Sequence, residues 1–171
     1  AKLRFGQETL DHQIELIIQI EINGGASAVF HGMHEDDARA FLKHPPTMFA
    51  SDSSVRAYKK GLHHPRGSGN VAPFLELYVR DQKQLHLEEA IRKLTYLPAS
   101  TFKLKGRGVI GKGYAADLVV FDPAKVQDNA TFKQPNQYAT GFRLVLVNGQ
   151  PVVEYDKHNG AGPGQVIRRA K

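Results

Sequence analysis

A short apolar run that ends abruptly in polar residues constrains this chain more than any other feature. Residues 47–50 (Thr-Met-Phe-Ala) follow Pro45-Pro46 and precede the polar cluster Ser51-Asp52-Ser53-Ser54. An apolar run of this length, bounded by prolines and a polar loop, predicts a buried strand. Asp52 would then lie at the carboxyl end of that strand, where barrel enzymes hold catalytic residues. Asp52 also fits a structural role, as a helix N-cap or a turn residue.

The first part of the chain alternates predicted helices and strands. An apolar stripe at helical spacing, with Thr9 as N-cap and Gly24 as stop, predicts a helix over 9–22. A strand is predicted at 26–30, and the next helix begins at the acids of 35–37 and ends before Pro45. With the strand at 47–50, this order is typical of parallel βα units in an α/β fold.

The character of the sequence changes near residue 105. A long loop is predicted at 55–69, and short helices at 74–80 and 87–97. A glycine-rich stretch follows, and strands are predicted at 118–121, 143–147 and 152–155, with Asn148-Gly149 as a type I′ hairpin turn between the last two. We therefore expect an α/β part over residues 1–105 and a small β subdomain over residues 106–171.

Composition narrows the classes of partner and location. The chain has no cysteine, so it has no disulfide and no thiolate metal ligand, which fits a reducing compartment such as the cytoplasm. It has no apolar run of about 18 residues and no visible signal peptide, so we expect no membrane partner and a cytoplasmic location. The net charge is +6, but acids are mixed among the basic residues. A solvated basic surface explains this charge, and no nucleic-acid partner is expected.

Several short motifs occur in an order that matches a known family. In the first part these are Gly24-Gly25-Ala26-Ser27, Ser51-Asp52-Ser53, His64-Pro65-Arg66-Gly67 and the run from Leu87 to Lys93. In the second part they are the run from Gly113 to Asp122, Val147-Asn148-Gly149, and the run from Gly160 to Gly164. The combination resembles the amidohydrolase superfamily, and more closely its N-acyl-D-amino-acid deacylases, over nearly the whole chain.

The resemblance implies a fold, a metal and a set of functional residues. The fold is the C-terminal part of a TIM-like (β/α)₈ barrel, followed by a small β subdomain. In that family a zinc-bound hydroxide attacks the amide carbonyl of an N-acyl-D-amino acid, and a carboxylate matching Asp52 carries the proton to the leaving amine. Arg66 would bind the substrate carboxylate, because a guanidinium can donate two hydrogen bonds to it. His64, Ser51 and Ser53 belong to the same motifs and are further candidate substrate-binding residues.

The zinc ligands are expected to lie mainly upstream of this sequence. The family's His-x-His motif is absent, His31 and His34 sit at a predicted strand-to-helix junction, and the adjacent His63 and His64 diverge. A zinc site needs its ligands in a fixed geometry, so we assign no metal ligand and interpret His31 and His64 as structural or supporting residues. A complete barrel takes about 250 residues. We therefore expect a C-terminal piece of a deacylase that is inactive alone and associates with itself or with the rest of the enzyme.

Two alternatives stay open. A cyclic-amide hydrolase of the dihydroorotase or hydantoinase kind shares the motif from Gly113 to Asp122, although the His-Pro-Arg-Gly motif favours a deacylase. A catalytically inactive module, kept for interaction or structure, is the other alternative. Asp117, inside the shared motif, we interpret as a structural turn residue and not as a catalytic acid.

Overall fold

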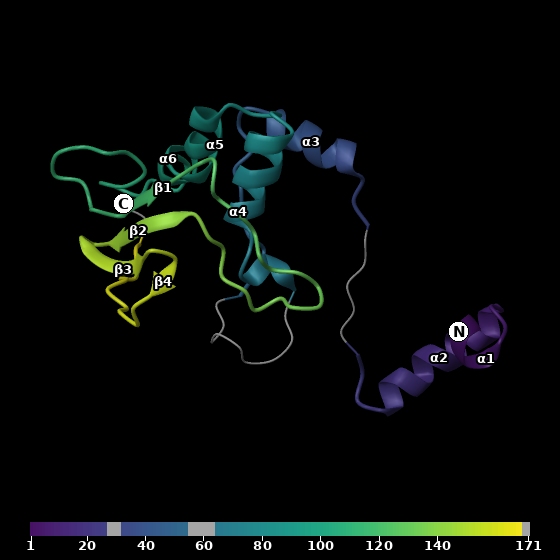
Figure 1. Cartoon of the computed structure of the whole chain (residues 1–171). Helices are drawn as coiled ribbons and strands as arrows, with labels where there is room; N and C mark the ends of the chain where they lie inside the picture. The colour runs from purple at the N-terminus through teal and green to yellow at the C-terminus, as the bar shows by residue number, and fades with distance from the viewer. Residues whose placement is uncertain (27–31, 55–63, 169–171) are drawn as a thin grey trace. The chain divides into compact units, whose positions relative to one another are not determined.

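The computed structural model describes residues 1–26, 32–54 and 64–168, and the chain divides into two compact units, Ala1–Gly32 and Met33–Lys171 (Figure 1). The first unit contains α1 (Lys2–Phe5) and α2 (Leu10–Ile22). Thr9 begins α2 as predicted, because its Oγ1 accepts a hydrogen bond from the backbone N–H of His12 at 3.3 Å. The prediction of a helix over 9–22 is confirmed.

The apolar stripe of α2 is exposed in the structure. Leu10 is 70% exposed, Ile17 66% and Ile22 77%. None of the residues of α2 is buried by the parts of the chain that the structure describes. The helix therefore presents an apolar face of the kind that an element of a packed layer normally covers.

The helices of the second unit lie together, beside the sheet (Figure 1). They are α3 (Glu35–Lys43), the 3₁₀ turn η1 (Pro65–Gly67), α4 (Val71–Pro73), the π-helix η2 (Phe74–Asp81), α5 (Leu87–Leu94) and α6 (Tyr96–Thr101). The helix predicted over 87–97 is confirmed from Leu87 to Leu94, but it ends there, because the chain breaks at Thr95, whose φ is −127° and ψ −78°. Pro98 has no N–H and its ring disfavours a helical bond to Leu94, which explains the break.

In the part of the chain that the structure describes, four antiparallel strands form one sheet. They are β1 (Leu118–Phe121), β2 (Phe142–Val147), β3 (Gln150–Glu154) and β4 (Lys157–His158), and they neighbour one another in that order. The three predicted strands are confirmed, and so is the turn at Asn148 and Gly149, whose φ values of 48° and 78° suit type I′. Sequence analysis missed β4, which follows a second turn with positive φ at Tyr155 and Asp156.

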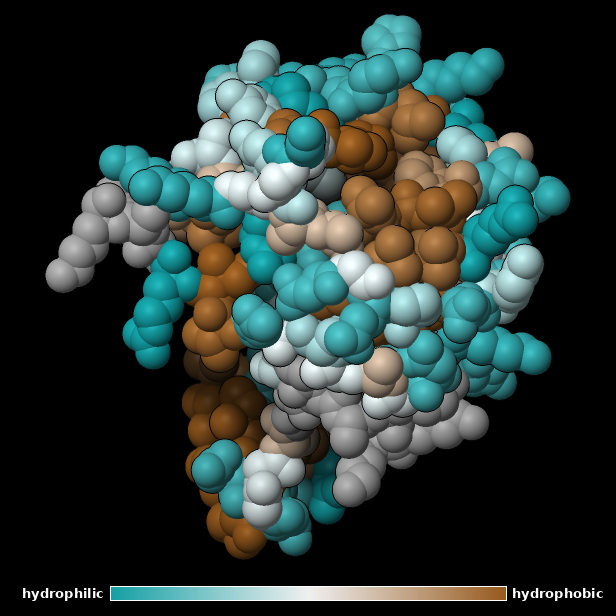
Figure 2. Space-filling view, turned by 90° about the vertical axis from the view of Figure 1, so that its left-hand side faces the viewer, coloured by the Kyte–Doolittle hydropathy of each residue, from teal (hydrophilic) through white to brown (hydrophobic). Residues whose placement is uncertain are grey.

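One apolar core lies between the helices and the sheet. Its buried members are Ala72, Phe74, Leu75, Ala90 and Val126. Phe121 and Phe142, from the strands, pack against them. Residues on both sides of position 105 thus share one core, and the domain boundary predicted there stays a prediction. Outside the core, apolar patches alternate with polar side chains on the face seen from the left-hand side of Figure 1 (Figure 2).

The strand predicted at residues 47–50 is not formed. The backbone from Thr47 to Ser54 is irregular, and in the described part of the chain no strand pairs with it. A parallel strand is defined by hydrogen bonds to its neighbours, so an apolar run without such a neighbour has no ladder to join. Of the strand predicted at 26–30, Ala26 is not in a strand and the other residues lie outside the described residues.

Side chains of α5 hold this irregular segment in place of a ladder. Lys93 is buried, with a side chain 1% exposed, and its Nζ donates to the backbone carbonyls of His44 (2.6 Å), Thr47 (3.0 Å) and Pro45 (3.4 Å). Arg92 Nη2 also donates to the Pro45 carbonyl, at 2.7 Å. The turn that leads from α3 toward Asp52 is therefore fixed by two cations of α5.

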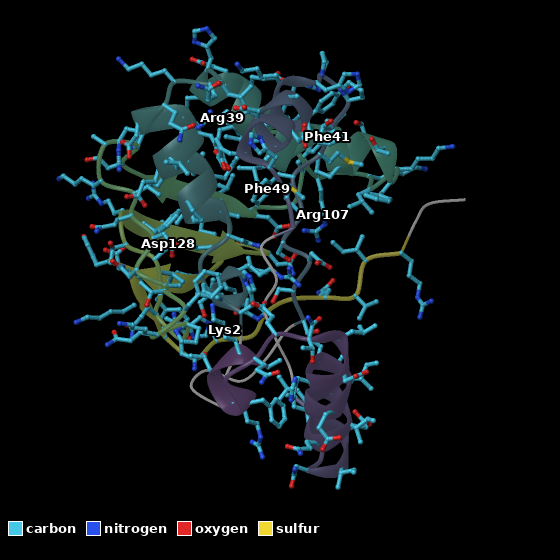
Figure 3. All side chains as sticks on the ribbon, turned by 90° about the vertical axis from the view of Figure 1, so that its right-hand side faces the viewer. Lys2, Arg39, Phe41, Phe49, Arg107 and Asp128 are labelled. Carbon is cyan, nitrogen blue, oxygen red and sulfur yellow. The ribbon has the colours of Figure 1, made fainter. Side chains whose placement is uncertain are left out.

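Phe49 secures the next stretch of the same segment. Its ring points toward the helices of this unit (Figure 3) and stacks on Phe74 of η2, with ring centroids 4.5 Å apart. Such aromatic contacts add to the free energy gained from burying the rings. In the parts that the structure describes, no helix combines the length and the apolarity needed to cross a membrane.

Replacing Lys93 by methionine tests the role of this buried cation. The variant keeps the length of the side chain but removes the donor to three carbonyls, so the free energy of unfolding should fall by about 1–3 kcal/mol. Urea denaturation of the chain would measure this fall. The matched control is Lys112→Met at an exposed position, which should change the free energy of unfolding by less than about 0.5 kcal/mol. Equal effects of the two substitutions would contradict the assigned role of Lys93.

Candidate active site

Asp52 lies in the irregular segment with its carboxylate in solvent. Its φ is 49°, in the left-handed region, and its side chain is 87% exposed. The carboxylate Oδ2 lies 3.1 Å from Nη2 of Arg66. Beside it, the backbone N–H of Ser53 donates to Oγ of Ser51 at 3.3 Å, so these two serines close a local turn. The structure thus brings the predicted acid and the predicted guanidinium together.

Arg66 is presented by a short, well-bonded turn. Pro65 begins η1 at a position that suits its fixed φ, and its ring is buried. The ring Nδ1 of His64 accepts a hydrogen bond from the backbone N–H of Arg66 at 3.1 Å and so caps the turn. Gly67 lies close to the loop that contains Ser53. A Cβ added to Gly67 would be only 3.1 Å from Oγ of Ser53. The His-Pro-Arg-Gly motif therefore holds the backbone of Arg66 against the Asp52 loop.

The residues that support this turn come from the segment between β1 and β2. The ring of Phe132 meets that of His64 edge to face, with centroids 5.2 Å apart. Asp128 lies against Gly69 so closely that no Cβ would fit there. Sequence analysis missed both residues, since nothing local to 128–132 indicates a contact with residues 64–69. The glycine at 69 was the available signal, because a residue without a side chain permits so close an approach.

The predicted substrate-binding residues now have known surroundings. Arg66 pairs with Asp52, His64 caps η1, and Ser51 and Ser53 bond within their own loop. Their contacts with a substrate stay predictions. The loop predicted at 55–69 is described from residue 64 onward, so His63 lies outside the described residues.

No metal centre is formed by the side chains that the structure describes. No group of three His, Cys, Asp or Glu residues in those ranges could hold an ion. His34 caps α3, where its Nδ1 accepts from the backbone N–H of Asp36 at 3.3 Å, and His31 lies outside the described residues. The described residues therefore do not by themselves fit a zinc ion, which needs three or four ligands in a fixed arrangement.

Asp117 is structural, as interpreted from the sequence. Its carboxylate pairs with Arg107 and accepts a hydrogen bond from the backbone N–H of Asn148 at 2.8 Å. Arg107 also donates to Oδ1 of Asn148 at 3.1 Å. The motif from Gly113 to Asp122 thus fastens the glycine-rich stretch to the hairpin turn. A hollow of about 740 Å³ next to this network is lined by residues such as Tyr96, Lys103 and Tyr114, and it contains none of the candidate site residues.

The chain is similar to known proteins over most of its length. The profile described as "Amidohydrolase family" matches residues 21–153, more than three quarters of the chain. The D-aminoacylase of Alcaligenes xylosoxydans xylosoxydans is 42% identical over 144 residues, which are 84% of this chain and 29% of that protein. The N-acyl-D-glutamate deacylase of the same organism is 37% identical over 144 residues, with the same two shares. The chain therefore spans less than a third of the length of these relatives.

Solved structures of deacylases are also similar to this chain in fold and sequence. A crystal structure of D-aminoacylase matches with a TM-score of 0.74 and 42% identity, over 80% of this chain and 28% of that one. The N-acyl-D-glutamate deacylase from Bordetella bronchiseptica, complexed with zinc and a phosphonate inhibitor, matches with a TM-score of 0.70 and 38% identity, over 81% and 28%. These similarities confirm the predicted fold class, a partial TIM-like hydrolase barrel followed by a small β subdomain.

Asp128 gives a pH test of the support beneath the Arg66 turn. Burial, and after it the charge of Glu76, raises the pKa of Asp128, although the hydrogen bond from the Ala130 N–H acts the other way. An acid with a raised pKa in the folded state favours folding while it is protonated, and this contribution is lost as pH rises through the raised pKa. Asp128→Asn removes the burial cost of the charge, so it should raise the unfolding temperature at pH 7 more than at pH 3.

Asp122→Asn is the matched control for this experiment. Asp122 also accepts a hydrogen bond from the N–H two residues on, that of Ala124 at 3.0 Å, but its side chain is 48% exposed. It should show no gain at pH 7. Thermal unfolding followed by circular dichroism at both pH values would measure the effect. A gain from Asp128→Asn that is equal at the two pH values would contradict the burial of a charged carboxylate.

Proposed function

The chain belongs to the amidohydrolase family, and on that premise we propose that it is part of a zinc-dependent deacylase that converts N-acyl-D-amino acids to a D-amino acid and a carboxylate. The relatives named D-aminoacylase, N-acyl-D-aspartate deacylase and N-acyl-D-glutamate deacylase support this choice of substrate class. The observation that carries the proposal is the meeting of Asp52 and Arg66, 3.1 Å apart, in loops that follow different segments of the chain.

Asp52 is the proposed proton carrier. Hydrolysis of an amide needs a base that takes a proton from the attacking water and an acid that gives it to the leaving nitrogen, and one carboxylate can do both in turn. The carboxylate of Asp52 is 87% exposed, so no described part of the chain shields it from a substrate. The carbonyl carbon gains the water oxygen, its bond to nitrogen breaks, and the proton ends on the amine.

Arg66 is the proposed group for the substrate carboxylate. Every N-acyl-D-amino acid carries an α-carboxylate, and the planar guanidinium suits it because two parallel hydrogen bonds can form. Fixing that end of the substrate would orient the amide toward Asp52. His64, Ser51 and Ser53 border the same two loops and complete the proposed binding surface.

Zinc enters the proposal as a cofactor held by other parts of the enzyme. The relative from Bordetella bronchiseptica is complexed with zinc. When bound in such a site, zinc lowers the pKa of a water molecule and so supplies the nucleophile. In this chain the described residues offer no three-ligand group, so the contribution proposed for the chain is the proton carrier and the carboxylate site.

The first test replaces Asp52 by asparagine in the complete gene product. The amide keeps the shape of the side chain but cannot carry the proton, so kcat for N-acetyl-D-amino acids should fall by about 10²–10⁴-fold. Zinc content, measured by metal analysis, should stay unchanged. Turnover within about tenfold of the unaltered protein would show that another group carries the proton.

The second test replaces Arg66 by alanine. Loss of a charged, bidentate contact to the substrate carboxylate should raise KM for N-acetyl-D-amino acids by tenfold or more, on the order of 1.5–3 kcal/mol of binding. The control is Arg143→Ala, an exposed arginine on β2, which should leave KM unchanged. Steady-state kinetics would measure both, and an unaltered KM for Arg66→Ala would refute the assigned contact.

A further inference from the structure

The dipeptide Asn-Gly, at which a protein chain can modify itself, occurs three times in the sequence, at Asn23-Gly24, Asn148-Gly149 and Asn159-Gly160. The backbone nitrogen of the glycine can attack the amide carbon of the asparagine side chain, because a glycine has no Cβ to crowd the approach. A succinimide ring forms and ammonia leaves. The three pairs have different surroundings in the structure, so their reactivity can be compared within one chain.

At Asn159-Gly160 the attacking N–H is bound to a base. The backbone N–H of Gly160 donates to Nδ1 of His158 at 2.9 Å. An imidazole nitrogen that accepts a hydrogen bond from a reacting group can also take its proton. Nucleophiles in proteins are activated by a base at this kind of distance. His158, Asn159 and Gly160 are all exposed, so water also reaches the pair.

The amide side chain of Asn159 is folded back over the same peptide bond. Its Oδ1 accepts a hydrogen bond from the backbone N–H of Ala161 at 2.9 Å, which closes a ring around the Asn159–Gly160 peptide. A backbone N–H in this place stabilises the negative charge that develops on the oxygen when the carbon is attacked. Gly160 has a φ of 87°, and a Cβ placed there would meet nothing within 4 Å in the described part of the chain. The glycine nitrogen is therefore uncrowded on that side.

Asn148-Gly149 lacks this arrangement. The N–H of Gly149 donates to the backbone carbonyl of Ala116 at 3.0 Å, and a carbonyl accepts a hydrogen bond without taking the proton. The Asn148 side chain is bound to distant residues, with Arg107 donating to its Oδ1 at 3.1 Å and its Nδ2 donating to the Pro163 carbonyl at 2.8 Å. These bonds direct the amide away from the peptide that follows it.

Asn23-Gly24 likewise pairs its glycine N–H with a carbonyl. The N–H of Gly24 donates to the backbone carbonyl of Glu21 at 3.1 Å. The side chain of Asn23 donates from Nδ2 to the carbonyl of Gln19 at 2.6 Å, back along α2. This pair and Asn148-Gly149 therefore serve as internal references for Asn159-Gly160.

We propose that Asn159-Gly160 is a site of self-catalysed deamidation, with His158 as its general base. The imidazole takes the proton of the Gly160 nitrogen while that nitrogen bonds to Cγ of Asn159. The bond from Cγ to Nδ2 then breaks, and the nitrogen leaves as ammonia with the proton that the imidazole returns. Water opens the succinimide, which leaves aspartate or isoaspartate at position 159.

The modification weakens the attachment of the following segment to the sheet. Asn159 is bound to β3 twice, through its backbone N–H to the Val152 carbonyl at 3.1 Å and through Nδ2 to the Pro151 carbonyl at 2.8 Å. Loss of Nδ2 as ammonia removes the second bond, and isoaspartate adds a carbon to the main chain. Residues 160–168 then lose part of their connection to β3.

The first experiment measures the deamidation rate at each pair. The 171-residue chain is incubated at fixed pH and temperature, folded and in concentrated urea, and its peptides are analysed by mass spectrometry. The ratio of the folded to the unfolded rate should be about tenfold or more higher at Asn159 than at Asn148 and Asn23, because only Asn159 has a positioned base. Equal ratios at the three pairs, or a lower ratio at Asn159, would overturn the proposal.

His158→Gln tests the base itself. Glutamine retains an acceptor for the Gly160 N–H but does not take its proton, so the rate at Asn159 in the folded chain should fall by about tenfold, the lower end of what a positioned base contributes. The rate at Asn148 should stay the same, which also shows that the chain remains folded. His86→Gln, at an exposed histidine before α5, is the control and should change none of the rates. An unchanged rate at Asn159 in His158→Gln would show that the imidazole plays no part, and the proposal would fail.

Discussion

The candidate site depends on the hydrogen bonds that one buried ammonium group donates. Lys93 has almost no exposed surface, and burial lowers its pKa, because a charge loses the solvation of water. Carbonyls of His44, Pro45 and Thr47 surround it, with Glu89 at 3.8 Å. An isolated buried charge would be unstable, so these acceptors and the cation require one another. The path of the chain toward Asp52 is thus set by a residue of α5 and not by a strand ladder.

The sheet contributes to the site through the segment that joins β1 to β2. Phe132 meets the ring of His64, and Asp128 lies against Gly69. Glu76 of η2 in turn accepts from the Asp128 N–H at 2.7 Å, which ties this segment to the helices. The His-Pro-Arg turn is therefore supported by residues from beyond the predicted boundary at 105. The α/β part and the β subdomain predicted from the sequence differ in composition. Residues of both parts nevertheless support the turn that carries Arg66.

Local signals in the sequence were sufficient for most helices, strands and turns. The N-cap at Thr9, the acids that begin α3 and the Asn148-Gly149 turn each act within a few residues, so they can be recognised without the fold. Asp52 and Arg66 were recognised because they belong to motifs of a known family. Lys93 and Asp128 were missed because their partners lie far away along the chain. The prediction of a strand at 47–50 was wrong. A strand forms only where neighbouring strands pair with it, and a local apolar pattern does not show whether such neighbours are present.

The backbone at Asp52 has a consequence for which residues this position can accept. A φ of 49° is a conformation that aspartate, asparagine and glycine adopt more readily than other residues. Glutamate would keep the charge but add a longer side chain to a strained backbone, whereas asparagine and glycine would keep the backbone and lose the charge. The proposed chemistry and the backbone thus select aspartate only in combination. Position 52 therefore has to satisfy two demands at once, a left-handed backbone and a short side chain that carries a negative charge, and aspartate is the residue that satisfies both.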